Sequence, residues 1–107
     1  MRGPSEIDPI ELKRRLGKGD KPVILDVREP WEIATASITG TLNIPMGDLP
    51  SRLAELDPNR ETIVMCHHGV RSAQVAMFLT RSGFERVLNL AGGIDGWSEI
   101  DPSVPRY

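Results

Sequence analysis

The sequence predicts an α/β fold, in which short strands and helices alternate along one domain. Short apolar runs rich in β-branched residues, typical of buried strands, recur along the chain, and segments with helical spacing or capping residues lie between them. The chain has 107 residues, of which 39% are apolar and 26% charged, so it has room for one compact core. Together these observations indicate a sheet with helices packed against it.

Local patterns place the expected elements. Asp8 suits a helix N-cap, and Glu11 completes a capping box with it. This helix is expected to begin at Pro9 and to end at Gly17. Apolar, β-branched runs predict strands at residues 23–27, 41–44, 62–65 and 87–90. Capping residues and helical spacing predict further helices after Pro30, over residues 49–56 and 70–82, and after residues 91–93.

The two ends of the chain carry less pattern than its middle. We expect one domain over residues 1–107, with a core that spans about residues 7–100. Residues 101–107 contain two prolines and are expected to form an extended, poorly ordered tail. Trp31 and Trp97 are interpreted as packing residues.

Composition excludes several classes of function. The formal net charge is -2, and the Lys and Arg residues are scattered, so a nucleic-acid partner is not expected. No window approaches the ~18 apolar residues of a membrane span, and the first residues lack the apolar stretch of a secretory signal. The single cysteine cannot form an internal disulfide, which indicates a reducing compartment. We expect a cytoplasmic protein without a membrane partner, and the sequence leaves its oligomeric state open.

The stretch from Cys66 to Ser72 joins a predicted buried strand to a predicted buried helix. In open α/β sheets, ligands bind at such junctions, outside the carboxyl ends of the strands. A tight turn around Gly69 can point several backbone N–H groups inward and form an anion nest at the helix N-terminus. Helix N-termini and nearby cations such as Arg71 favour the thiolate form of a cysteine, which is the nucleophile. The pattern therefore predicts an anion-handling thiol at Cys66.

Three other interpretations of Cys66 compete with this one. A lone cysteine after a strand is often a small core residue. His67 and His68 suggest a metal site, but adjacent side chains diverge and structural zinc needs about four ligands at wider spacing, so no metal is expected. A cysteine–histidine catalytic pair is conceivable, although directly adjacent residues seldom orient well for proton transfer. We interpret both histidines as loop residues that shape access and electrostatics.

The sequence also resembles the rhodanese-like domains, from about Ile7 to Trp97. Four blocks carry the resemblance: LDVREPWE (25–32), NIP (43–45), CHHGVRS (66–72) and NLAGGIDGW (89–97). Each block alone is a weak signal, whereas their order and spacing together are specific.

This resemblance implies a central, mainly parallel five-stranded sheet flanked by helices on both faces, and a sulfurtransferase that needs no cofactor. Cys66 would take sulfane sulfur from a donor such as thiosulfate and pass it, as a persulfide, to cyanide or to a thiol, including a protein thiol. Asp26 and Arg28 would brace the loop by hydrogen bonds, the alternative being an ordinary surface ion pair. Arg71 would attract the anionic donor. The residues expected to bind the substrate are His67, His68, Gly69, Val70, Arg71 and Ser72.

One segment departs from the family pattern, and two other functions remain as alternatives. Residues 36–41 read ASITGT where the family often has GHIPGA, so a histidine and a proline are replaced and the local turn is in question. Phosphatases and arsenate reductases with this fold place five residues between cysteine and arginine, whereas four separate Cys66 from Arg71. The shorter loop suits one sulfur atom better than a phosphate. A non-catalytic binding module is the second alternative, which the presence of Cys66 disfavours.

Overall fold

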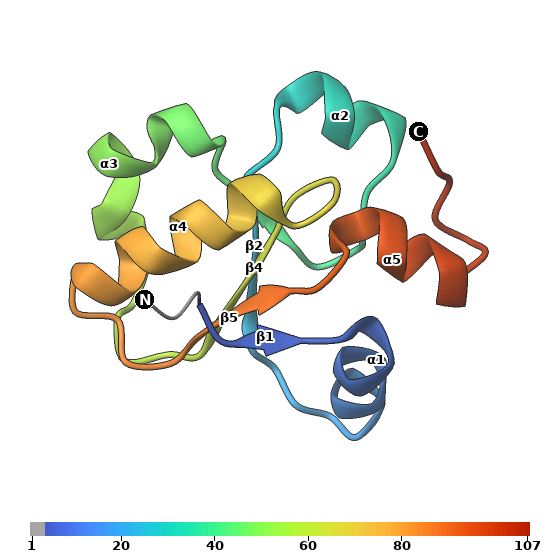
Figure 1. Ribbon diagram of the computed structural model, residues 1–107, viewed down its shortest axis with the longest axis horizontal. Helices are drawn as coiled ribbons and strands as arrows, with labels where there is room; N and C mark the ends of the chain where they lie inside the picture. Colours follow the sequence, from blue (N-terminus) through green and yellow to red (C-terminus); the bar gives the residue numbers. More distant parts are fainter. Residues whose placement is uncertain (1–3) are drawn as a thin grey trace.

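The computed structural model describes residues 4–107, and a sheet of five parallel strands runs through it (Figure 1). The strands are β1 (Glu6–Ile7), β2 (Val23–Asp26), β3 (Leu42–Asn43), β4 (Thr62–Met65) and β5 (Val87–Leu90). They lie in the order β1-β5-β4-β2-β3, and every neighbouring pair is parallel. The carboxyl ends of all five strands therefore lie along one edge of the sheet, and Cys66 follows β4 at its centre.

Helices cover both faces of this sheet (Figure 1). On one face lie α1 (Pro9–Gly17) and α5 (Gly93–Ile100). On the other face lie α3 (Leu49–Arg52), between the short 3-10 helices Met46–Asp48 and Leu53–Glu55, and α4 (Val70–Arg81). Helix α2 (Pro30–Thr35) follows β2 at the carboxyl edge of the sheet.

Successive residues of the central strands point to opposite faces and so build two hydrophobic cores. Ile24 and Ile63 pack toward α1 and α5, whereas Leu25 and Val64 pack toward α3 and α4. Cys66 belongs to the second core. Strand β4 is buried along its whole length, which explains why its sequence is a continuous apolar run rather than an alternating one.

Most of the predicted elements are confirmed, and so is the predicted fold class. Helix α1 has the predicted bounds, and the carboxylate of its N-cap Asp8 accepts a hydrogen bond from Glu11 N at 2.8 Å. Strands β4 and β5 also have their predicted bounds, while β2 and β3 are shorter than expected. Strand β1 was not predicted, because its two residues are too few to form a pattern and pair only with β5.

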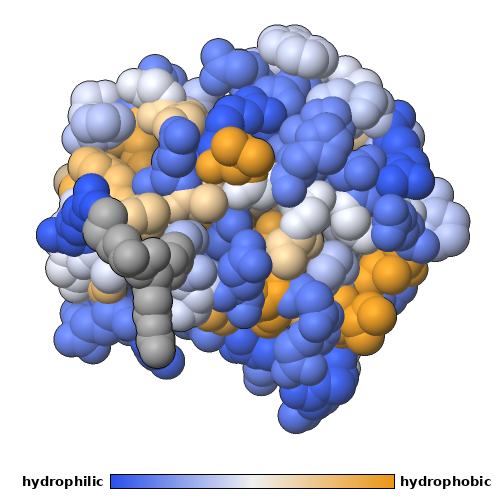
Figure 2. Space-filling model, viewed as in Figure 1, coloured by the Kyte–Doolittle hydropathy of each residue, from blue (hydrophilic) through white to orange (hydrophobic). Residues whose placement is uncertain are grey.

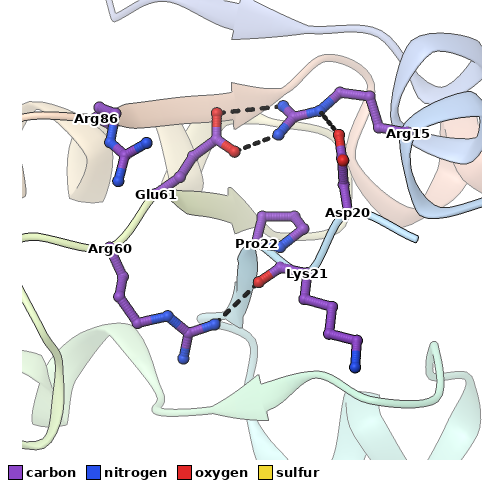
Figure 3. Close-up of a pocket in the computed structure, with 7 residues that line it drawn as sticks. All are labelled: Arg15, Asp20, Lys21, Pro22, Arg60, Glu61 and Arg86. Atoms are coloured by element: carbon purple, nitrogen blue, oxygen red, sulfur yellow. Dashed lines mark hydrogen bonds and ion pairs between the residues drawn. The ribbon is translucent and has the colours of Figure 1, made fainter. Parts of the chain in front are cut away.

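Ion pairs and hydrogen bonds hold the opposite edge of the sheet, where the strands begin (Figure 3). The guanidinium of Arg15, from α1, contacts the carboxylate of Glu61 just before β4 and lies 3.1 Å from Asp20 Oδ2 in the loop after α1. Arg60 Nη2 donates to the carbonyl of Lys21, 2.9 Å away. These contacts fix the loop before β2 against the start of β4, at the end of that strand farthest from Cys66.

On the face seen in Figure 2, hydrophobic patches are small and separated by hydrophilic residues. Among the described residues, the exposed large hydrophobic side chains are Ile10, Trp31, Leu42, Val70 and Phe78. The interpretation of Trp31 as a packing residue is wrong, because its side chain is 65% exposed at the start of α2. Trp97 is buried in the core beneath α5. Over residues 4–107, no helix has the length and apolar character needed to cross a membrane.

Residues 101–107 return to the domain, and the expectation of a poorly ordered tail is not met. The Asp101 carboxylate accepts hydrogen bonds from Ser103 N and Oγ, which turns the chain after α5. Val104 is then buried in the core on the face of the sheet that α1 and α5 cover. At the end of the segment, the Tyr107 ring stacks on His67 with 4.0 Å between the ring centroids. The last residues thus reach the carboxyl edge of the sheet.

Candidate active site

Cys66 lies between the end of β4 and the start of α4, and its side chain is 1% exposed. The chain turns sharply at Gly69, the N-cap of α4, whose φ of 108° lies in the left-handed region that favours glycine. This turn brings the first residues of α4 back over the end of β4. The cysteine sulfur is therefore held at the N-terminus of a helix, at the carboxyl edge of the sheet.

Two polar groups lie next to the Cys66 sulfur, a backbone N–H and a hydroxyl. Gly69 N lies 3.0 Å from Sγ, and Ser72 Oγ lies 3.3 Å from it. Gly69 is the N-cap of α4 and Ser72 lies in its first turn, where the aligned peptide dipoles favour a negative charge. The backbone N–H of Gly69 and the N-terminus of the helix can thus act together on an anionic sulfur.

Asn89, in β5, holds both ends of the turn that follows Cys66. Its Nδ2 donates to Gly69 O at 3.1 Å, and its Oδ1 accepts from Ser72 Oγ at 2.5 Å. The second acceptor of Nδ2 is Glu6 Oε2, 3.2 Å away. The sequence interpretation gave Asn89 no role of its own. A polar residue inside an apolar strand is a signal that could have identified it, because a buried amide needs hydrogen-bond partners.

The N-terminus of α5 holds the other side of the Cys66 loop. Ile94 N donates to Cys66 O at 2.9 Å, and Asp95 N donates to His67 O at 3.0 Å. The helix can approach this closely because its first residue is Gly93, where an added Cβ would lie under 3.0 Å from both carbonyl oxygens. The loop is therefore clamped between the N-termini of α4 and α5.

Arg71, in the first turn of α4, forms a bidentate ion pair with Glu32 of α2. The distances are 2.7 Å from Nη1 to Oε1 and 2.8 Å from Nη2 to Oε2. Glu29 N and the Tyr107 hydroxyl donate two more hydrogen bonds to the same carboxylate. The Arg71 pair is the main reason that the pKa of Glu32 falls from its ordinary 4.5 to about 2, against the opposing effect of burial. The same pair raises the pKa of Arg71. Sequence reasoning singled out Arg71 but not Glu32.

Asp26 and Arg28 form a second ion pair, and it is fully buried, so the alternative of an ordinary surface pair is wrong. Arg28 Nη2 lies 2.7 Å from Asp26 Oδ2, and neither side chain has exposed surface. The other partners of the guanidinium are Ala36 O at 2.8 Å, Tyr107 Oη at 2.9 Å and Glu32 O at 3.3 Å. Within the described part of the chain, these bonds hold α2 and Tyr107 rather than residues 66–72 directly. The support that Arg28 gives to the loop passes through Glu32 and its pair with Arg71.

The two histidines of the loop are stacked. The ring centroids of His67 and His68 are 3.9 Å apart, and Tyr107 stacks on His67 as well. His68 Nε2 lies 3.9 Å from Asp95 Oδ2, and one potential ligand atom from each of His67, His68 and Asp95 falls within a 4.8 Å cluster. His67 thus packs against two neighbouring rings, whereas the side chain of His68 is 63% exposed. This geometry favours a packing role for His67.

The depressed pKa of Glu32 predicts how the Glu32→Gln variant behaves with pH. Because the pKa falls from 4.5 to about 2 on folding, the carboxylate stabilises the fold at pH values above 4.5, and this contribution is lost as the pH falls through about 2. At pH 7 the wild type should exceed the variant in unfolding free energy by about 3 kcal/mol, and most of this difference should disappear between pH 5 and pH 2. Urea unfolding at several pH values measures it.

Glu55→Gln is the matched control for this prediction. Its carboxylate also pairs with an arginine, Arg52, but both side chains are exposed, so solvent screens the pair. We expect a much smaller difference from the wild type at every pH. A Glu32→Gln difference that stays constant down to pH 2 would show that the ion pair does not stabilise the fold in the way described.

Comparison with known proteins agrees with this geometry. The Rhodanese-like domain family matches residues 8–100, which is most of the chain. The chain belongs to the rhodanese-like domain family. A sulfurtransferase from Allochromatium vinosum is 38% identical to it over 94 residues, which are 88% of each chain. Thiosulfate sulfurtransferase GlpE from Tolumonas auensis is 33% identical over 79 residues, 74% of each chain.

A solved rhodanese-like domain protein from Staphylococcus aureus has the same fold. It superposes on this chain with a TM-score of 0.85 at 31% identity, and the match covers 96% of this chain and 98% of that one. In the present rhodanese-like domain, the predicted loop around Cys66 is held by β4, α4 and α5. The buried pair of Asp26 and Arg28 contacts α2 instead. Four residues that sequence reasoning did not assign to the site complete it: Glu32, Asn89, Gly93 and Tyr107.

Proposed function

We propose that this rhodanese-like domain transfers sulfane sulfur through a persulfide on Cys66. The observation that carries the proposal is the environment of Sγ, which accepts a hydrogen bond from Gly69 N and lies 3.3 Å from Ser72 Oγ at the N-terminus of α4. Such a site stabilises an anionic sulfur, as the thiolate before the donor reacts and as the persulfide afterwards. The names of the relatives from A. vinosum and T. auensis support the same reaction class.

The reaction consists of two displacements at sulfur. In the first, the Cys66 thiolate attacks the outer sulfur of thiosulfate, a bond forms between Sγ and that sulfur, and the S–S bond of the donor breaks. Sulfite leaves with the electron pair, and the persulfide carries one negative charge. In the second, cyanide or a thiolate attacks the outer sulfur, and the Cys66 thiolate is regenerated. This is ping-pong covalent catalysis, in which the enzyme visits two stable forms.

The size of the loop supports sulfur transfer over reactions of larger oxyanions. Four residues separate Cys66 from Arg71, and the turn at Gly69 closes the nest directly over Sγ, 3.0 Å from the backbone nitrogen. The backbone of residues 67–72 would surround one additional sulfur atom, with the Ser72 hydroxyl beside it. Asn89 would keep this hydroxyl in place through its bond to Ser72 Oγ. The cycle needs a free thiol, so we place it in a reducing compartment such as the cytoplasm.

Turnover assays with three kinds of substrate test this proposal. With thiosulfate and cyanide we expect thiocyanate to form, with the parallel-line kinetics of a ping-pong mechanism. With an aryl phosphate or with arsenate and a thiol, we expect no turnover above the level of the uncatalysed reaction. Thiocyanate formation no faster than without protein, with thiosulfate and with a monoanionic thiosulfonate alike, would contradict the proposal and favour a binding module. Hydrolysis of the aryl phosphate would favour a phosphatase.

A further inference from the structure

Arg71, the cationic residue of the Cys66 loop, is paired with a carboxylate. Both terminal nitrogens of its guanidinium are bound to the Glu32 carboxylate, at 2.7 Å and 2.8 Å. The Arg71 side chain is 36% exposed, so it borders solvent at the mouth of the loop, whereas the Glu32 side chain is 4% exposed. An incoming anion therefore meets a guanidinium whose charge is already balanced by a buried carboxylate.

Further hydrogen bonds to the Glu32 carboxylate keep it paired with Arg71. Each oxygen of Glu32 accepts two hydrogen bonds: Oε1 from Arg71 Nη1 and Glu29 N, and Oε2 from Arg71 Nη2 and the Tyr107 hydroxyl. The Tyr107 hydroxyl in turn accepts from Arg28 Nη1 at 2.9 Å, which fixes its proton toward Glu32. To free Arg71, a donor would have to break a bidentate pair whose carboxylate cannot swing away.

The second arginine near the loop adds no net charge either. Arg28 is fully buried and paired with Asp26, which is fully buried as well. The groups in direct contact with Sγ on this side are the Gly69 N–H and the α4 N-terminus, which carry partial charges only. The Cys66 sulfur does contribute to the raised pKa of Arg71, which indicates that the guanidinium lies within electrostatic reach of the sulfur.

We propose that Glu32 is a specificity-determining residue of the Cys66 site: by holding Arg71 in a closed ion pair, it disfavours dianionic sulfur donors relative to donors that carry one negative charge or none. This inference rests on the proposed sulfur transfer and names its donor class, organic persulfides and thiosulfonates.

With a persulfide, the Cys66 thiolate attacks the outer sulfur of R–S–SH, Cys66–S–SH forms, and R–S⁻ leaves with the electron pair of the broken S–S bond. A thiosulfonate R–SO₂–S⁻ gives the Cys66 persulfide anion and a sulfinate in the same way.

Two donors of similar shape and different charge isolate this effect. Thiosulfate is a dianion, and methanethiosulfonate is a monoanion in which a methyl group replaces one oxygen. Because kcat/KM for the donor in a ping-pong reaction reports the first displacement only, the ratio of the two values measures charge discrimination. In Glu32→Gln, we expect the ratio of thiosulfate to methanethiosulfonate to rise about tenfold, mainly through the KM of thiosulfate, because the Arg71 charge is no longer balanced.

Glu32→Gln tests charge with little change of shape, since glutamine keeps the capping position toward Glu29 N. A purely structural role of Glu32 would lower kcat/KM for both donors together and leave their ratio unchanged, and this outcome would overturn the proposal. If the ratio stays constant while both donors still load sulfur onto Cys66, the proposed function stands and only the role of Glu32 is lost. If neither donor loads sulfur in the wild type, the proposed function itself fails.

The ionic-strength dependence of kcat/KM provides a second test. It uses the wild type alone, so it does not depend on whether a variant folds. An unbalanced Arg71 would attract thiosulfate electrostatically, and kcat/KM for thiosulfate would then fall as the ionic strength is raised. With the closed pair, we expect no such fall. A steep decrease with added salt, absent for methanethiosulfonate, would show that Arg71 acts as a free cation and would overturn the proposal.

Discussion

Replacing Cys66 with serine is expected to abolish sulfur transfer and to preserve the fold. Serine has nearly the same shape and can still accept the hydrogen bond from Gly69 N. Its hydroxyl is not ionised at neutral pH and cannot carry sulfane sulfur, so the first displacement has no nucleophile. We expect kcat/KM for the sulfur donor to fall by a factor of about 10³ or more, measured as thiocyanate formation.

A substitution on the far end of the same helix serves as the control. Ser82 follows α4 and its hydroxyl donates to Phe78 O on the surface, so Ser82→Ala is expected to leave the activity unchanged. Circular dichroism and thermal unfolding of Cys66→Ser should match those of the wild type. Full transfer activity in folded Cys66→Ser would contradict the persulfide mechanism.

Replacing Gly93 with alanine should destabilise the protein and displace the Cys66 loop, against which the N-terminus of α5 packs. The residue has φ of 59°, and an added Cβ would lie under 3.0 Å from the carbonyl oxygens of Cys66 and His67. Neither neighbour can yield easily, because the same carbonyls accept hydrogen bonds from Ile94 N and Asp95 N. We expect a loss of about 4 kcal/mol or more in the free energy of unfolding, from backbone strain and overpacking together. Sulfur transfer should fall as well, because the loop that holds Sγ must move.

Gly17→Ala is the matched control for this prediction. Gly17 ends α1, its φ is not positive, and an added Cβ would meet nothing within 4 Å. Alanine there should leave activity unchanged and raise the unfolding free energy by up to about 1 kcal/mol, because it restricts the unfolded chain and favours the helix. Urea unfolding and the transfer assay measure both variants. A Gly93→Ala protein as stable and active as Gly17→Ala would show that α5 does not clamp the loop.

Local chemistry explains which parts of the fold were predictable from the sequence. The capping residues Asp8 and Glu11 act within one turn, so the start of α1 was predicted to the residue. The continuous apolar run of β4 likewise needs no distant partner to be recognised. Strand β1 depends on pairing with β5, about eighty residues later in the chain, and two residues alone carry no periodicity. The five-stranded, mainly parallel sheet came from the family resemblance rather than from any local pattern, and the order of its strands was not predicted.

The part of the site whose residues are contiguous in the sequence could be predicted. The part whose residues come together only in the folded chain could not. Residues 66–72 were identified because a strand, a cysteine, a glycine and an arginine follow one another there. The partner of Arg71 lies 39 positions away on α2, and Tyr107 reaches Glu32 across 75 positions. Glu32 looked like an ordinary residue of a first helical turn, and Tyr107 belonged to a segment whose prolines and polar residues suggested no packing. Only the folded chain shows that Glu32 pairs with the arginine of the Cys66 loop and that Tyr107 holds this carboxylate in place.

The most direct test of the account is the intact mass of the protein after incubation with a sulfur donor. Thiosulfate or methanethiosulfonate should add one sulfur atom to the wild type, and later addition of cyanide should remove it. Cys66→Ser should show no gain under the same conditions. An unchanged mass of the wild type with both donors, or an equal gain in the variant, would contradict a persulfide on Cys66.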